Sequence, residues 1–97
     1  MHDFFDWDPK KARQNLAKHG VSFQQATEVF LDPFQLSIAD EEHSHTEERW
    51  ITLGKTTNQR LLVVVHTIEQ QGSTMAVRII SARRANRHEQ RQYENIL

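Results

Sequence analysis

Two apolar runs rich in β-branched residues, separated by a short glycine-containing turn, dominate the second half of the sequence. The first is Leu61 to Ile68 (LLVVVHTI), and the second is Met75 to Ala82 (MAVRIISA). Between them lies Gln71-Gly72-Ser73, a combination typical of a turn. Runs of this kind joined by a short turn form antiparallel hairpins, because a parallel crossover needs a dozen or more residues. The core of this chain must therefore be built on a sheet.

Caps, breakers and periodicity predict the other elements. Asp8-Pro9 is an N-cap followed by proline at the first helical position, and Gly20 ends that helix. Ser22 and Gln25 form a capping box before a second helix that Asp32-Pro33 ends. Strands are expected near residues 34–40, 49–53, 61–68 and 75–82, with a solvated loop at 40–48 and a last helix of about ten residues from Asn86. The prediction is a single α+β domain spanning residues 1–97: two N-terminal helices, a four-stranded antiparallel sheet and a C-terminal helix.

Strand alternation assigns the side chains of the predicted hairpin to two faces. One parity of each run is strongly apolar: Leu61, Val63, Val65, Met75, Val77 and Ile79. If the register buries both sets under the helices, His66 and Arg78 lie together on the other face. RNA cleavage without metal needs a proton acceptor, a proton donor and a cation for the phosphorane charge, so His66 is a candidate acid or base and Arg78 a candidate stabiliser. The alternative is that both decorate the open face of a half-buried sheet.

Arginines are concentrated where the last predicted strand passes into the final helix: Arg78, Arg83, Arg84, Arg87 and Arg91. A guanidinium is always charged and fits a phosphate as a planar fork, so this cluster indicates a polyanion site. Arg83 is the leading candidate, and Arg84, Arg87, Arg91 and Arg60 are candidate RNA-binding residues. The alternative is a solvated basic helix in which Arg87 and Arg91 pair with Glu94.

Aromatic and acidic residues supply further candidates. Tyr93, the only tyrosine, can supply a phenolic proton or simply pack the helix down. Trp50 can stack on a base if it faces outward, although such residues are more often core. Glu89 can serve as a general base, and its capping box with Asn86 is the simpler role. His43 and His45, on an acidic loop without a third ligand, form a weak metal signal, so neither a metal nor a cofactor is expected.

Composition limits the class of protein. The 97 residues include no cysteine and no apolar run near the roughly 20 residues that cross a bilayer, which favours a cytoplasmic protein without disulfides or a membrane span. The net charge of −1 conceals an asymmetry. Residues 1–48 contain four Lys/Arg against ten Asp/Glu, whereas residues 49–97 contain eight against three. Because a local field steers an anionic partner, the near-neutral total is compatible with nucleic-acid binding.

The whole pattern resembles a known family. The segments FDWDPKKARQNLAKHGVSFQQATEVF, EERWITLG, RLLVVVHT and RIISARRANRHEQRQYE are similar to the BrnT family of bacterial type II toxins from Phe5 to Glu94. The resemblance implies a RelE-like fold and a metal-independent endoribonuclease that blocks translation and arrests growth. It also implies a BrnA-type antitoxin that neutralises the toxin and forms a hetero-oligomer with it. Arg83 matches the closing motif of the family, with Glu89 and Tyr93 as weaker matches.

Two hypotheses follow from the residues and the resemblance. The first is a ribonuclease toxin in which Arg83 and Arg78 bind the scissile phosphate while His66 or Tyr93 transfers protons. The second is a non-catalytic module that binds nucleic acid or protein through the same basic surface. Cleavage of a defined RNA, abolished by Arg83→Ala, separates the two.

Overall fold

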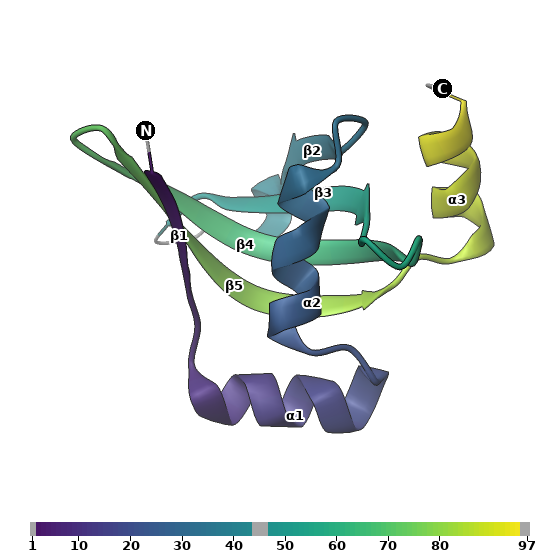
Figure 1. Cartoon of the computed structure of the whole chain (residues 1–97), viewed down its shortest axis with the longest axis horizontal. Coiled ribbons are helices and arrows are strands. Elements are labelled where there is room, and N and C mark those ends of the chain that lie inside the picture. The colour runs from purple at the N-terminus through teal and green to yellow at the C-terminus, as the bar shows by residue number, and fades with distance from the viewer. Residues whose placement is uncertain (1, 44–46, 96–97) are drawn as a thin grey trace.

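The computed structural model, which describes residues 2–43 and 47–95, has a five-stranded mixed sheet with α1 and α2 on one face and α3 at one end (Figure 1). The strand order is β1-β5-β4-β3-β2. Along the chain the elements are β1 (His2–Asp6), α1 (Pro9–His19), α2 (Phe23–Thr27), the 3-10 turn η1 (Glu28–Leu31), β2 (Leu36–Ala39), the 3-10 turn η2 (Glu41–His43), β3 (Arg49–Lys55), β4 (Leu61–Gln71), β5 (Thr74–Arg84) and α3 (Arg87–Glu94).

The predicted four-stranded antiparallel sheet behind two N-terminal helices is wrong, because a strand precedes the helices and joins the sheet. β1 pairs with β5 in parallel, with Phe5 opposite Val77. The segment HDFFD is short and contains no β-branched residue, so it lacks the pattern that marks the other strands. Tertiary packing holds it at the edge instead: the rings of Phe5 and Phe30 lie 5.5 Å apart between centroids.

The register of the β4–β5 hairpin also differs from the predicted one. Val65 pairs with Ser81 and His66 with Ile79, so β5 contains one extra residue, Ile80, at a bulge. The bulge reverses the alternation along β5, so that Val77 and Ile79 before it and Ala82 after it all face α1 and α2, as do the even-numbered positions of β4 throughout. His66 is fully buried on that face, whereas Arg78 is exposed opposite Thr67. The prediction that His66 and Arg78 share a face is wrong.

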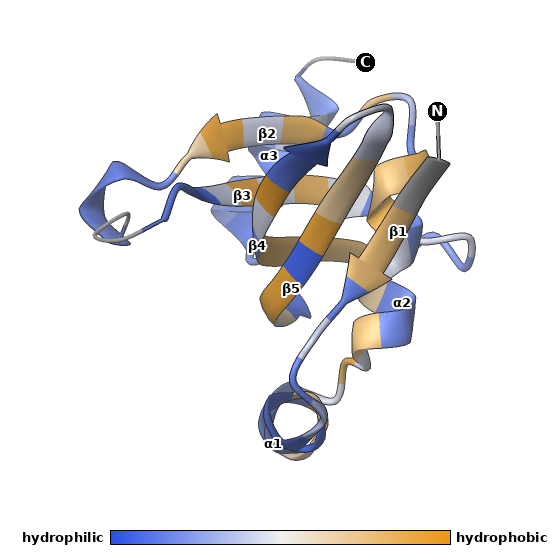
Figure 2. Ribbon diagram, turned by 90° about the vertical axis from the view of Figure 1, so that its left-hand side faces the viewer, coloured by the Kyte–Doolittle hydropathy of each residue, from blue (hydrophilic) through white to orange (hydrophobic). Residues whose placement is uncertain are grey.

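The main core lies between the sheet and the helices α1 and α2. Its buried residues are Val21, Phe23, Ala26, Val29, Leu62, Val64, Val77, Ile79 and Ala82. Figure 2 shows the corresponding colours, with mostly apolar strands and strongly polar α1 and α3. Asn15 is buried beside this core, and its side-chain amide bonds the carbonyl and the N–H of Ala82 at 2.8 and 3.1 Å. This satisfied amide joins α1 to β5, because an unpaired amide there would be costly.

Local signals placed the starts of the helices well, but the second helix ends earlier than predicted. α1 begins after the Asp8 cap and ends at Gly20, whose φ is 70°. α2 begins after Ser22 but ends at Thr27, and the chain tightens into η1 before Asp32. Gly54 explains how η1 can lie so close to β3, since a Cβ there would stand 3.0 Å from Val29. In the described part of the chain, no helix has the length and apolar content needed to cross a membrane.

Candidate functional site

The face of the sheet opposite α1 and α2 carries an open groove of about 540 Å³. Its floor consists of two rows of side chains that run across four strands, namely Leu36–Leu53–Val63–Arg83 and Ile38–Ile51–Val65–Ser81. α3 closes one end with the polar side chains of Glu89, Gln92 and Asn95. The groove is therefore apolar along its length and charged where β5 meets α3.

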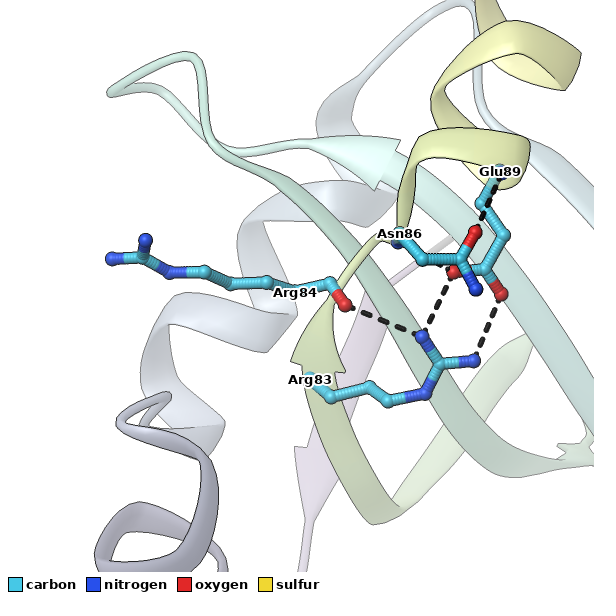
Figure 3. A network of polar contacts seen from close by, with 4 residues as sticks. All are labelled: Arg83, Arg84, Asn86 and Glu89. Atoms are coloured by element: carbon cyan, nitrogen blue, oxygen red, sulfur yellow. Dashed lines mark hydrogen bonds and ion pairs between the residues drawn. The ribbon is translucent and has the colours of Figure 1, made fainter.

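Arg83 and Glu89 form the charged end of this groove. The two guanidinium nitrogens Nη1 and Nη2 of Arg83 donate to the two carboxylate oxygens of Glu89, each at 2.8 Å (Figure 3). Nη1 also donates to the carbonyl oxygen of Arg84 at 3.2 Å. Glu89 is in turn fixed by its capping box, because Oε1 accepts the backbone N–H of Asn86 at 2.8 Å. The predicted capping role of Glu89 is confirmed, and the same carboxylate orients Arg83.

This pair keeps unused hydrogen-bonding capacity. Bonds within the described residues occupy three of the five N–H groups of Arg83, and the remaining ones are on Nε and Nη2. Oε2 of Glu89 accepts a single such bond and retains a lone pair. The side chain of Arg83 is 43% exposed and that of Glu89 is 18% exposed. A phosphate and a hydroxyl can therefore be bound at the pair without breaking it.

Each partner shifts the ionisation of the other. The hydrogen bond from Arg83 lowers the pKa of Glu89, with smaller contributions from the Asn86 N–H and from the charges of Arg83 and His88. Correspondingly, the Glu89 carboxylate raises the pKa of Arg83. Both groups are charged at neutral pH, so Glu89 begins any reaction as a carboxylate able to accept a proton.

His88 is a candidate that the sequence interpretation missed. It is exposed on the first turn of α3, and its charge is close enough to influence Glu89. Its position immediately before Glu89 in the run NRHEQ was the available signal. Imidazole is the side chain best suited to proton exchange near neutral pH, so His88, next to Glu89 in sequence, is a further candidate for proton transfer.

The predicted RNA-binding residues do not converge on one pocket. Arg84 points away from the Arg83–Glu89 pair (Figure 3), because consecutive strand residues face opposite sides. Arg87 and Arg91 are exposed on α3. Arg60 lies in the β3–β4 turn, and its Nη1 donates to the Gln25 side chain at 3.4 Å. Trp50, half-buried, has the parity of Thr52 and therefore lies on the face of the sheet opposite the groove.

His66 lies in the core rather than in the groove. Its Nε2 is 2.6 Å from the hydroxyl of Thr52, which is itself 2.6 Å from the hydroxyl of Ser37. The ring of Phe30 packs edge-on against it, with centroids 4.8 Å apart. Burial lowers the pKa of His66 from 6.5 to about 4, so the ring is neutral at neutral pH. A fully buried imidazole has no contact with substrate, and the structure does not support the predicted role of His66 as an acid or base.

Arg78 is far from Arg83 along β5. They are five positions apart, which corresponds to about 15 Å of extended strand. The guanidinium of Arg78 donates to the carboxylate of Asp6 on β1 at 2.7 Å. Both side chains are exposed, so the pair is a surface contact between the edge strand and its neighbour. The structure does not bring Arg78 to the site of Arg83.

Tyr93 is almost completely buried and serves as an anchor of α3. Its hydroxyl donates to Oδ2 of Asp32 at 2.5 Å, and Lys55 Nζ lies 5.5 Å from the centre of its ring. Burial raises the pKa of Tyr93 to about 12, and the hydrogen bond and the charge of Asp32 act in the same direction. The phenol therefore stays protonated; Tyr93 packs against Leu53 and Val63 of the groove floor without lining the groove itself, which favours a packing role over proton transfer.

No cluster of three or more potential metal ligands occurs among residues 2–43 and 47–95. The exposed His43 on η2 interacts with the mostly buried carboxylate of Asp40 at 3.0 Å. His45, the second member of the weak metal signal, lies outside the described residues.

Comparison with known proteins gives this geometry its context. Residues 7–89 match the family described as the ribonuclease toxin BrnT of type II toxin–antitoxin systems. The crystal structure of the Brucella abortus ribonuclease toxin BrnT is similar, with a TM-score of 0.61 and 25% identity over 90% of this chain and 100% of that one. No curated protein sequence matches the chain. The predicted family is confirmed: the chain belongs to the BrnT family of type II toxin–antitoxin systems and is a ribonuclease toxin, with an RNA target and an antitoxin partner.

Proposed function

We propose that this ribonuclease is a metal-independent endoribonuclease whose reaction takes place at the Arg83–Glu89 end of the groove. The observation that carries the proposal is the bidentate pair itself, which is exposed to the groove and retains two guanidinium donors and one carboxylate lone pair. A cation and an ionised base held 2.8 Å apart are the two groups that attack by a ribose hydroxyl on the adjacent phosphate requires.

The proposed reaction is transfer of the phosphodiester to the neighbouring 2′-hydroxyl. Glu89 accepts the 2′-hydroxyl proton as the O2′–P bond forms, and Arg83 stabilises the charge that develops on the phosphorane oxygens. The P–O5′ bond breaks, and protonated His88 donates its proton to the departing oxygen. The products are a 2′,3′-cyclic phosphate and a 5′-hydroxyl, so atoms and charges balance without metal or cofactor.

The cellular role follows from the chemistry and the family. We propose that cleavage removes RNA needed for protein synthesis, which blocks translation and arrests growth in the cytoplasm. The antitoxin would be of the BrnA type and would form a hetero-oligomer with the toxin. To neutralise the toxin, the antitoxin has to prevent RNA from reaching Arg83, either by covering the groove or by inserting a segment into it.

A cleavage assay with a chelator tests the proposal. The purified chain is incubated with single-stranded RNA in excess EDTA, and 2′,3′-cyclic phosphate ends are measured. Arg83→Ala should reduce the rate by about 10²- to 10³-fold. Arg78→Ala, the same substitution on the same strand but on an arginine outside the site, is the matched control. Cleavage that stops with EDTA, or that survives Arg83→Ala in a folded protein, contradicts the mechanism.

The rival reading of a non-catalytic binding module keeps one observation in its favour. The floor of the groove is apolar, and Ile38 remains 64% exposed. Such a surface also suits a protein segment. RNA that is retarded on a gel but remains intact, with wild-type protein and no chelator, would favour that reading.

A further inference from the structure

A second cleft, of about 230 Å³, lies on the other side of the end of β5. Its lining residues are Gln59, Arg60, Leu61, Arg84, Ala85 and Gln90. Arg83 and Arg84 are consecutive, yet the side chain of Arg84 extends away from the Arg83–Glu89 pair (Figure 3). The junction of β5 and α3 therefore presents one arginine to the groove and the next to this cleft.

The backbone brings the two arginines of the cleft together. Arg84 pairs with Leu62 across the hairpin, and the Ala85 N–H donates to the Leu61 carbonyl at 3.0 Å. Arg60 directly precedes Leu61 at the end of the β3–β4 turn. The Thr56 N–H closes this turn by donating to the carbonyl oxygen of Arg60 at 2.9 Å. The two side chains thus emerge from neighbouring, hydrogen-bonded segments.

The cleft is positively charged, and its lining residues include no negative charge that could neutralise the two arginines. None of those residues is acidic, and neither Arg60 nor Arg84 forms an ion pair with any residue of 2–43 or 47–95. The bond of Arg60 to Gln25 is long, at 3.4 Å, and its acceptor is neutral. Two guanidinium groups that line one small cleft repel each other unless an anion lies between them. The amides of Gln59 and Gln90 add neutral donors at its edge.

We propose that the Arg60–Arg84 cleft binds a backbone phosphate of the RNA strand whose scissile phosphate lies on Arg83. This inference rests on the proposed function and adds a second contact to it. A phosphodiester fits because guanidinium forks match its oxygens, whereas the lining offers no aromatic ring for a base to stack on. Because Arg83 and Arg84 are adjacent, a strand leaving the groove around the end of β5 passes directly over the cleft.

Binding to an uncleavable RNA tests the cleft independently of catalysis. A fluorescent single-stranded RNA with 2′-O-methyl groups is titrated with the full chain, and the dissociation constant is measured by anisotropy over a series of salt concentrations. The double variant Arg60→Gln, Arg84→Gln should weaken binding by about tenfold. The magnitude of the slope of log K against log salt should fall by about 0.7, because the contact with one phosphate of a single strand is lost.

The matched control is Arg13→Gln, which removes an exposed arginine from α1. A double variant whose affinity and salt slope equal those of this control overturns the proposal. Should the double variant unfold, Arg84→Gln alone, with its exposed side chain, provides the same test at about half the slope change. Wild-type protein that binds through both arginines but cuts no natural RNA supports the cleft and contradicts the catalytic proposal instead.

Discussion

The hydroxyl of Tyr93 lies 2.5 Å from a carboxylate oxygen of Asp32, although 61 positions separate the two residues. The same oxygen accepts the backbone N–H of Lys55 at 2.7 Å, and the other oxygen of the carboxylate accepts the N–H of Phe34 at 2.9 Å. One carboxylate thereby joins the end of η1, β3 and α3. Since Glu89 is one helical turn before Tyr93, this bond also fixes the position of the proposed base.

Removal of the Tyr93 hydroxyl should destabilise the protein. Tyr93→Phe leaves the ring packed but deprives a buried carboxylate of a donor, so we expect the free energy of unfolding to fall by about 1–3 kcal/mol. Urea unfolding measures the change. A double-mutant cycle with Asp32→Asn should give a coupling energy above about 0.5 kcal/mol, and strictly additive losses would show that the bond contributes nothing.

The hairpin shows where sequence reasoning succeeded and where it stopped. Length, caps and the Gln71-Gly72-Ser73 turn located β4, β5 and α1 because these signals are local. The bulge at Ile80 has no such signal, and one extra residue exchanges the two faces of a strand. His66 was misassigned because the turn pairs Gln71 with Thr74, which places the even positions of β4 opposite the odd positions of β5 from the turn as far as His66. β1 was missed for a related reason, since its pairing with β5 depends on residues more than 70 positions away.

The candidate site likewise has features that local sequence signals predict and features that they do not. Arg83 was predicted from a local motif and stays a proposal, whereas the capping box of Glu89, predicted from spacing, is confirmed. Their contact at the edge of a groove could not be read from the sequence, since the groove is assembled from four strands. Arg78 was grouped with Arg83 on proximity in sequence alone, and an extended strand separates residues that a helix would bring together.

His66 should make the protein sensitive to mild acid. Its pKa is about 4 in the folded state, against 6.5 for an unperturbed histidine, so between these values the unfolded chain binds the proton more readily. Stability is therefore complete above pH 6.5 and declines by about 3 kcal/mol as the pH falls to about 4. Denaturant titrations across this range measure the loss.

The variant His66→Gln should flatten that pH dependence whatever its effect on stability at neutral pH. It should also retain RNA cleavage at neutral pH in proportion to the folded fraction, because the ring has no contact with the groove. A folded His66→Gln protein without activity would return His66 to the catalytic set, and an unchanged slope would show that another group titrates in this range.

The Arg78–Asp6 ion pair should contribute little to either stability or activity. Both side chains are about half exposed, so water and salt screen the attraction. Arg78→Ala should lower the free energy of unfolding by at most about 1 kcal/mol, with a smaller loss at high salt. Its cleavage rate should stay within about twofold of wild type. A loss comparable to that of Arg83→Ala would mean that the RNA path extends along β5 to Arg78.

His88 should act as the proton donor to the leaving oxygen, and substrates with different leaving groups can reveal this. His88→Gln should reduce the cleavage of RNA by about 10²-fold, because the 5′-oxygen is a poor leaving group without a proton. A uridine phosphate ester of nitrophenol needs no such proton, so the same variant should cleave it within a few-fold of wild type. His43→Gln, on the exposed turn η2, serves as the matched control and should leave both rates unchanged. Equal losses on both substrates would show that His88 binds RNA or supports α3 without transferring a proton.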